Sequence, residues 1–324
     1  MRFRRTGLLV WIRNQTRICA KTSGINAVAA GTVLLGALSV SPLPAQTVSF
    51  NAPFASISQS TVQYGQGIVA DAASNLYITG TINLLYLQRN SNGTYTPAST
   101  KIDSVGGTAY GLAIDAANNL YRPDIAPTGT NPYLAKYTYL GVNSFQKNSI
   151  GTWTSANSPS SVAVDSNYNV YVLDAGGSSV STGSIVKLTP SVSCSTLASC
   201  TTYTQTTLVT DTRLHGTTGL SIDASGNFYV SSGAHTGNTP TTVSNSTATV
   251  YKLIFGSSSY SFNTLGSSWN SPAATAVDST GIVWVADYGA QKIYQLTRHR
   301  RAPQRRVTRK QSSNLRPASH VSEH

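Results

Sequence analysis

The sequence is poor in charged side chains and has almost no glutamate. Only 10% of its 324 residues are Asp, Glu, Lys or Arg, and no Glu occurs before Glu323. So few charges do not suit the solvent faces of surface helices, whereas the abundant Ser, Thr, Gly, Asn and Tyr suit short strands joined by tight turns. The same scarcity excludes a Glu general acid from all but the end of the chain. We therefore expect an all-β protein.

The sequence motifs of two large enzyme classes are also missing. The chain has no GxSxG nucleophile elbow and no GxxxxGK phosphate loop. Histidine is scarce, because only His215 and His235 lie between residues 46 and 297. These absences disfavour nucleophilic catalysis and phosphoryl transfer, and we expect no cofactor.

The net charge of +12 comes from the two ends of the chain. Residues 1–45 hold six Arg/Lys and no acid, and residues 298–324 hold eight Arg/Lys against Glu323 alone. The segment between them is close to neutral, with nine Arg/Lys and ten Asp. Because no basic stripe interleaves with aromatic residues, we expect the folded segment not to bind nucleic acid.

The ends have the composition of a targeting segment and a tail. A basic stretch up to Lys21 precedes the apolar run INAVAAGTVLLGALSV, and a Pro-rich stretch ending at Ala45 offers a cleavage site. The run is short for a membrane span, so residues 1–45 are predicted to be an export signal, with an uncleaved anchor as the alternative. Residues 298–324 lack apolar alternation and predict a basic, disordered tail. The mature chain should then be periplasmic or extracellular, without a membrane span.

The cysteines fit an oxidising compartment. Cys19 lies in the leader, and Cys194 and Cys200 are separated by five residues in SVSCSTLASC. Two close cysteines in an exported chain favour a disulfide that closes a loop. A metal site is disfavoured there, because the loop contains no His, Asp or Glu.

One repeat dominates the segment from 46 to 297. Its five copies align without gaps: GIVADAASNLYITG from Gly67, GLAIDAANNLYRPD from Gly111, SVAVDSNYNVYVLD from Ser161, GLSIDASGNFYVSS from Gly219 and ATAVDSTGIVWVAD from Ala274. In each copy apolar residues alternate up to an Asp, small or polar residues follow, and a second alternating run is centred on an aromatic residue. The pattern predicts a strand, a tight turn and a strand.

The spacing of the repeats predicts four strands per unit. Successive repeated Asp residues are 44, 50, 58 and 55 residues apart, which is typical of propeller blades. Most copies are followed by a third apolar stretch, such as SIVKLT from Ser184, and by a more polar fourth one, such as TTYTQTTLV. The prediction is a β-propeller of four-stranded antiparallel blades.

The pattern Gly-apolar-Ala-apolar-Asp, followed by Asn-apolar-Tyr-apolar, resembles the NHL repeat over residues 47 to 297. The resemblance implies a propeller, and NHL propellers usually have six blades, whereas five repeats are visible here. The segment TVSFNAPFAS from Thr47 is similar to the fourth strand SYSFNTLG. We expect this N-terminal strand to complete the blade begun at Ala274 and to close the ring, which removes exposed sheet edges. A sixth blade is the alternative.

The repeated Asp residues are the first candidates for a role. They are Asp71, Asp115, Asp165, Asp223 and Asp278. Each lies at a turn, where its carboxylate can accept hydrogen bonds from backbone N–H groups two or more residues later. Because every copy has one, we expect these side chains to fix the turns and not to bind calcium.

A ligand surface is predicted at the opposite end of the strands. We call this end the loop face, and the end with the repeated Asp residues the turn face. The loops before the first strands carry Tyr64, Tyr110, Trp153, His215 and Trp269, and those after the second strands carry Asp124, Asp174, His235 and Asp287. Aromatic and polar groups around a central depression are typical of ligand contact, with covering of a blade edge as the alternative.

The leading functional hypothesis is an exported, monomeric scaffold that binds a protein, peptide or glycan through the loop face without catalysis. The alternative is a metal-dependent lyase or hydrolase that uses His215, His235 and Asp174. Enzymes on similar propellers argue against it, because the calcium-dependent lactonases use a Glu ligand and the zinc-dependent lyase uses three His. A structural role in the envelope is a third alternative.

Overall fold

The computed structural model describes residues 67–296, apart from 81–82, 96–99, 105–110, 125–130, 155–157, 178–179, 234, 237–238, 241–247 and 257–258. Within these ranges the regular structure is β-strand, with one 3-10 turn at Thr212–Leu214. No helix in this part of the chain is long and apolar enough to cross a bilayer. The predicted all-β class is confirmed. The predicted leader 1–45 and tail 298–324 lie outside the described residues.

Each repeat begins an antiparallel sheet whose strands pair in chain order. The first blade is β1 (Gly67–Ala70), β2 (Leu76–Thr79), β3 (Asn83–Leu87) and β4 (Thr100–Ser104). The second is β5 (Ala113–Ile114), β6 (Leu120–Asp124), β7 (Tyr133–Gly141) and β8 (Ser144–Thr152). The third is β9 (Pro159–Val164), β10 (Val170–Asp174), β11 (Gly183–Pro190) and β12 (Tyr203–Asp211).

The last two blades differ slightly from this plan. The fourth is β13 (Gly219–Ile222), β14 (Phe228–Ser232), β17 (Thr249–Phe255) and β18 (Tyr260–Leu265). A two-stranded ribbon, β15 (His235–Thr236) and β16 (Thr239–Pro240), interrupts it. The fifth has three described strands, β19 (Pro272–Val277), β20 (Val283–Asp287) and β21 (Lys292–Leu296).

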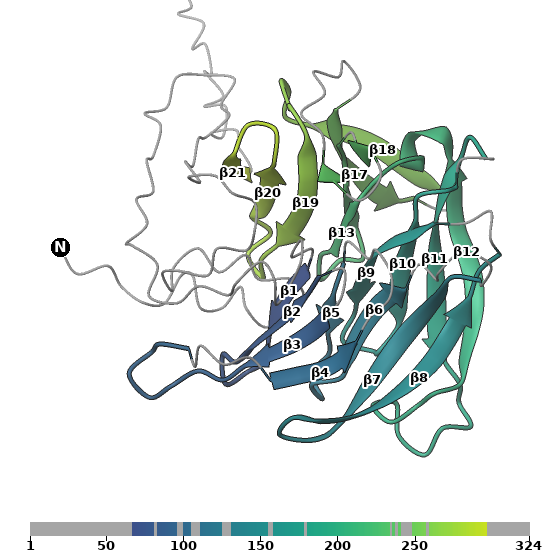
Figure 1. The fold of residues 1–324 in the computed structure, drawn as a ribbon. Helices are drawn as coiled ribbons and strands as arrows, with labels where there is room; N and C mark the ends of the chain where they lie inside the picture. The colour runs from purple at the N-terminus through teal and green to yellow at the C-terminus, as the bar shows by residue number, and fades with distance from the viewer. Residues whose placement is uncertain are drawn as a thin grey trace, which may run out of the picture.

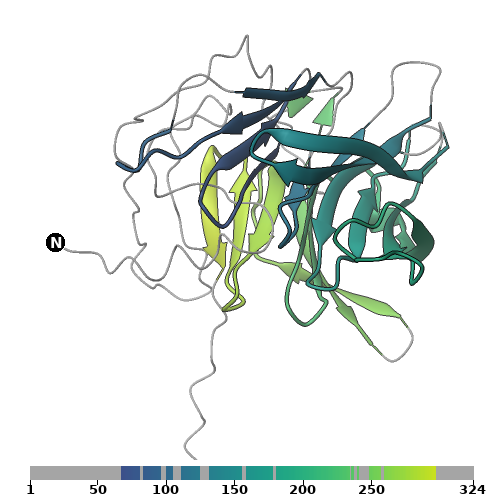
Figure 2. The same ribbon diagram turned by 90° about the horizontal axis from the view of Figure 1, so that it is seen from below.

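The five blades of the described chain follow one another around a ring, as predicted (Figures 1 and 2). Their first strands lie side by side, because β5 contacts β1 and β9, and β13 contacts β9 and β19. In Figure 1 the order runs from the blue β1–β4 to the yellow-green β19–β21. The strand predicted to complete the fifth blade, in residues 47–58, lies outside the described residues.

A carboxylate organises the turn between the first two strands of each blade. In the third blade, Asp165 Oδ1 accepts hydrogen bonds from the backbone N–H groups of Asn167 and Asn169, at 2.8 and 3.0 Å. Its Oδ2 accepts from the side-chain amide of Asn169 at 2.8 Å and from the Tyr171 hydroxyl at 3.0 Å. One side chain therefore holds both the turn and the aromatic residue of the second strand.

The same arrangement recurs in three further blades. Asp71, Asp115 and Asp223 each accept hydrogen bonds from the Asn four residues later and from the Tyr six residues later. The repeated Asn and Tyr are thus the donors that the repeated Asp requires. This explains in physical terms why the three residue types occur together in four of the five copies.

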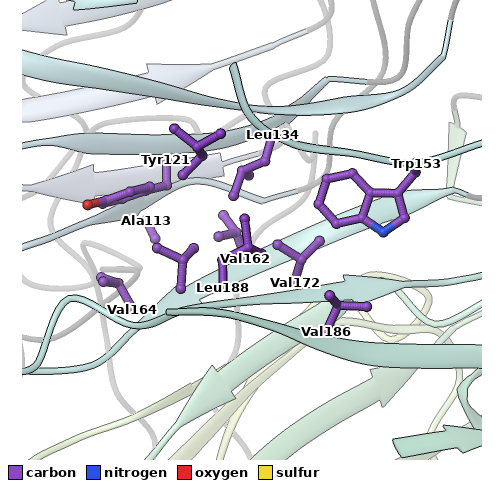
Figure 3. Close-up of a cluster of buried hydrophobic side chains, with 11 residues drawn as sticks. Ala113, Tyr121, Leu134, Trp153, Val162, Val164, Val172, Val186 and Leu188 are labelled. Carbon is purple, nitrogen blue, oxygen red and sulfur yellow. The ribbon is translucent and has the colours of Figure 1, made fainter. Parts of the chain in front are cut away.

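Neighbouring blades pack through one repeated arrangement of side chains. Tyr121 and Trp153 of the second blade lie in one buried cluster with Val162 and Val172 of the third (Figure 3). Equivalent clusters join the first blade to the second, the third to the fourth and the fourth to the fifth. Each cluster contains the repeated Tyr of one blade together with apolar side chains of the next, including the Phe228 ring, whose centroid lies 5.1 Å from that of Tyr171. The turn carboxylate therefore also positions the ring that packs against the following blade.

The small residue that opens each repeat is required by the closeness of the first strands. A Cβ atom at Gly111 would lie 2.8 Å from the Cα of Ser161, and one at Gly219 would lie 2.8 Å from the Cα of Ala274. Ser161 and Ala274 open the repeats of the following blades. A larger residue at either glycine would push two neighbouring blades apart.

Asp165→Ala should destabilise the protein by about 2–4 kcal/mol, because four donors lose their acceptor and some of them stay buried. The free energy of unfolding is measured by urea titration followed by tryptophan fluorescence.

Asp278→Ala is the matched control. Ile282 and Trp284 stand where the other copies have Asn and Tyr, and the Asp278 Oδ1 accepts from Thr280 and from the backbone of Ile282. We expect this variant to lose about 1–2 kcal/mol less than Asp165→Ala. Equal losses would contradict the importance of the Asn and Tyr donors.

Candidate functional site

The loop face contains two tryptophans that are buried. Trp153 is 6% exposed and lies in the cluster shown in Figure 3. Trp269 is 6% exposed, and its indole N–H donates to the backbone carbonyl of Leu265 at 2.8 Å. Both indoles take part in packing, and the ligand contact predicted for them stays a prediction. Tyr64 and Tyr110, predicted to join them, lie outside the described residues.

The Asp residues at the ends of the second strands hold the loop face together. Asp174 Oδ1 accepts from the backbone N–H groups of Ser158 and Gly176, at 2.8 and 3.0 Å. The carboxylate of Asp287 accepts from three backbone N–H groups of the loops around it. Both side chains are buried. Because these oxygens already bind backbone donors, the two carboxylates act as loop anchors in this structure.

Asp124 has a different partner, a fully buried arginine. The Arg122 Nη1 lies 3.2 Å from Asp124 Oδ2, and the Arg122 Nε donates to the Thr79 hydroxyl of the first blade at 2.9 Å. The Tyr133 hydroxyl also donates to Asp124 Oδ2, at 2.8 Å. The arginine therefore links two blades through polar contacts.

Sequence reasoning missed Arg122, although the repeat contains the signal. The other four copies have an aliphatic residue at this position, namely Ile78, Val172, Val230 and Val285. A charged side chain that replaces an aliphatic one in a single copy departs from the pattern. Such a departure marks a local interaction that the repeat itself does not require.

His215 is exposed and lies beside the turn that follows Asp174. The imidazole lies close to the backbone of this turn, since a Cβ atom at Gly176 would be 3.1 Å from the Cδ2 of His215. The side chain of His235 lies outside the described residues. Within the described ranges no group of three or more His, Cys, Asp or Glu could hold a metal ion. The site predicted from His215, His235 and Asp174 stays a prediction.

The exposed large hydrophobic side chains of the described chain gather on the turn face. They are Leu140, Val142, Val192, Leu197, Ile254 and Phe255. All six lie at the connection between the third and fourth strands of a blade, in the second, third and fourth blades. Antiparallel pairing puts this connection at the same end of the blade as the repeated Asp. We call these six side chains the apolar tips.

The apolar tips project strongly into solvent. Leu140 is 64% exposed, Phe255 is 59% exposed and Val192 is fully exposed. The Phe255 ring lies 5.0 Å from the ring of Tyr260 across its hairpin, measured between centroids. Single exposed apolar residues are ordinary on protein surfaces. Their restriction to one connection in three consecutive blades is the feature that requires an explanation.

The predicted disulfide is present and closes the connection of the third blade. Cys194 and Cys200 are joined, with their Cα atoms 5.3 Å apart. The loop reaches the second blade, where Lys136 Nζ donates to the carbonyls of Ala198 and Cys200, each at 2.7 Å. The Asn119 side chain donates to the same Ala198 carbonyl at 2.8 Å. The disulfide loop therefore ties the third blade to the turn of the second.

Burial lowers the pKa of Lys136 to about 8, against an ordinary value of 10.5. The amine lies over the rings of Tyr121 and Tyr203, 5.6 Å from each centroid. Burial raises the pKa of Tyr203 to about 12 and that of Tyr121 further. Burial thus keeps the phenols of Tyr121 and Tyr203 neutral at high pH and makes the Lys136 amine less basic.

The signal for Lys136 was present in the sequence. A lysine occurs in the third stretch of the second, third and fourth blades, as Lys136, Lys187 and Lys252. Each pairs directly with the repeated Tyr of its blade. A recurring lysine opposite a recurring tyrosine predicts a cation–π contact. Lys136 was not identified from the sequence, because this pattern was not used there.

Stability should fall as the pH rises above about 10. In the unfolded chain the tyrosines ionise near this pH, whereas burial raises the pKa of Tyr77, Tyr121 and Tyr137 in the folded chain. The folded state then holds protons that the unfolded state has lost, so stability is complete below the unfolded pKa and is lost above it. Lys136 has the opposite effect on stability between its pKa of about 8 in the folded chain and its ordinary value of 10.5, because burial disfavours the charged amine in the folded chain. Urea midpoints measured across this pH range give the curve.

Tyr203→Phe is the control, because it removes one raised pKa and keeps the ring. Its fall in stability above about pH 10 should be shallower than that of the unmodified protein. A curve that stays flat up to about pH 12 would contradict the burial of the phenols.

No protein-family model matches this chain, and no curated protein sequence is significantly similar to it. Solved structures with a similar arrangement include a gluconolactonase of Xanthomonas campestris, at 14% identity, with 72% of this chain and 75% of that chain covered and a TM-score of 0.48. Virginiamycin B lyase from Staphylococcus aureus has 12% identity, covers 79% and 72%, and has a TM-score of 0.44. A calcium-binding regucalcin from Agrobacterium tumefaciens has 9% identity, covers 74% and 70%, and has a TM-score of 0.46. The chain is distantly similar to these propellers in structure, and no activity follows from that likeness.

Proposed function

We propose that this protein is an exported, NHL-type propeller scaffold that binds a polypeptide through its turn face, without catalysis. One observation carries the proposal: the exposed large hydrophobic side chains of the described chain all lie at turn-face tips of three consecutive blades. Apolar surface gathered on one face is typical of a site that contacts another macromolecule.

The chemistry of the apolar tips favours a polypeptide partner over a glycan. Five of the six side chains are aliphatic and one is the aromatic Phe255. Aliphatic groups gain mainly from burial against other apolar groups, which a polypeptide supplies. No charged residue occurs between Lys187 and Asp211, the span that includes two of the tips. A neutral, apolar partner segment therefore complements this surface better than a charged one.

The turn face replaces the loop face as the favoured surface. The two tryptophans expected to contact a ligand on the loop face are packed between strands, whereas the apolar tips are open to solvent. A preformed apolar surface can bind without first moving buried side chains out of the core. The burial of Trp153 and Trp269 fits the alternative in which loop aromatics cover blade edges.

Selection from a library of random peptides tests the proposal. Peptides chosen by binding to the full chain should be rich in apolar residues. Their dissociation constant should rise at least about tenfold in the variant Val142→Ser, Leu197→Ser, Phe255→Ser, because the burial of three apolar side chains is lost. These side chains are exposed, so the substitutions should leave the fold intact, which circular dichroism verifies.

His215→Ala is the matched control on the loop face, and it should bind the selected peptides like the unmodified protein. Peptides that lose affinity in His215→Ala and keep it in the triple variant would overturn the proposal. So would a selection that yields no binding peptide. Turnover of a lactone or glycosidic substrate that disappears in His215→Ala would favour the enzymatic alternative instead.

A further inference from the structure

The disulfide loop, residues 191–202, is bound to the second blade by three hydrogen bonds. Its Ala198 and Cys200 carbonyls accept the Lys136 amine, and the Asn119 amide donates to the first of them. Most other side chains of the loop are exposed, including Val192 and Leu197. The loop therefore buries little apolar surface, and its position depends on these polar bonds and on the disulfide.

The repeated four-stranded blade does not require Lys136 to bind the disulfide loop. Lys187 and Lys252 occupy the same strand position in the next two blades. Lys187 is half-buried and lies 5.8 Å from the centroid of the Tyr171 ring, and Lys252 Nζ lies 3.7 Å from an oxygen of Asp223. Only Lys136, among these three described lysines, donates to a loop of the following blade and is fully buried.

The disulfide helps to hold the carbonyls of Ala198 and Cys200 where both accept hydrogen bonds from Lys136. Cys200 supplies one carbonyl itself, and Ala198 lies inside the ring that the disulfide closes. Opening the ring frees the chain between Cys194 and Cys200 to adopt many more conformations, and this entropy disfavours the paired arrangement. Cys194 is half-buried whereas Cys200 is 2% exposed, so a reductant would reach the sulfur of Cys194 first.

We propose that the Cys194–Cys200 disulfide is a redox-controlled latch that keeps Lys136 buried, and that its reduction by a dithiol opens the loop and exposes the amine. A thiolate of the dithiol attacks the Cys194 sulfur, forms a mixed disulfide and releases Cys200 as a thiolate. The second thiol of the reductant then displaces Cys194 and closes its own disulfide. The protein gains two electrons and two protons, and the dithiol loses both.

Opening the latch also changes the turn face, because Val192 and Leu197 belong to the same loop. The side chain of Leu197 lies next to Ala198, so it moves when that carbonyl leaves Lys136. The latch itself does not depend on the proposed binding function. Its test therefore measures the amine and not the binding of a partner.

Amine acylation of the full chain tests the latch directly. The folded protein is treated with an amine-reactive acetylating reagent, with and without dithiothreitol, and modification of each lysine is quantified by mass spectrometry of peptides. Lys136 should react at least about tenfold faster after reduction, because burial excludes the reagent from the oxidised protein. Lys187, for which the described residues show no bond to a loop of the following blade, should react at an unchanged rate and serves as the internal control.

The variant Cys194→Ser, Cys200→Ser gives a second route to the open state without reductant. It should expose Lys136 to the same extent as dithiothreitol does. Protection of Lys136 in both the reduced protein and the double variant would overturn the latch, as would rapid acylation of Lys136 in the oxidised protein. An equal rise at buried Lys252 would mean that the whole domain loosens, and this result would also reject a local latch.

Discussion

The structure depends on a hydrogen-bonded carboxylate at the first turn of each blade. In four blades the carboxylate binds the turn backbone, an asparagine amide and a tyrosine hydroxyl. The tyrosine ring so positioned packs among apolar side chains of the following blade. A single side chain thereby links local turn formation to the contact between blades. Because an ionised acceptor forms stronger hydrogen bonds than a neutral one, its repetition stabilises a fold with few other charges.

The fold was predictable because its signal is local and repeated. Alternating apolar residues around Asp165 and Asp223 specify paired strands, and the spacing between copies leaves room for two more strands per blade. The Cys194–Cys200 bond was predictable for a similar reason, since close cysteines have few other partners. The five-bladed count followed from the five copies. The closing strand in residues 47–58 stays a prediction, because its match to the repeat is short.

The candidate site was less predictable because it depends on contacts between blades. Nothing in the alternation around Trp153 and Trp269 distinguishes an exposed ring from one packed on a neighbouring blade. The hydrogen bond from Lys136 to Ala198 joins residues 62 positions apart, and a local sequence pattern cannot predict such a pairing. The apolar tips were visible as residues, but their placement on one face required the strand directions of three blades. Departures from the repeat, such as Arg122, were the available clue.

Hydrogen exchange at the amides that donate to the repeated carboxylates tests the central claim most directly. The backbone N–H groups of Asn75, Asn119, Asn169 and Asn227 each donate to the Oδ1 of the Asp four residues earlier. If the carboxylate holds each blade together, these four turn amides should exchange as slowly as the amides of the adjoining strands, because both open only when the blade unfolds. Exchange as rapid as that of the exposed Ser193 and Thr196 would contradict the claim, since the turns would then open independently of the blades.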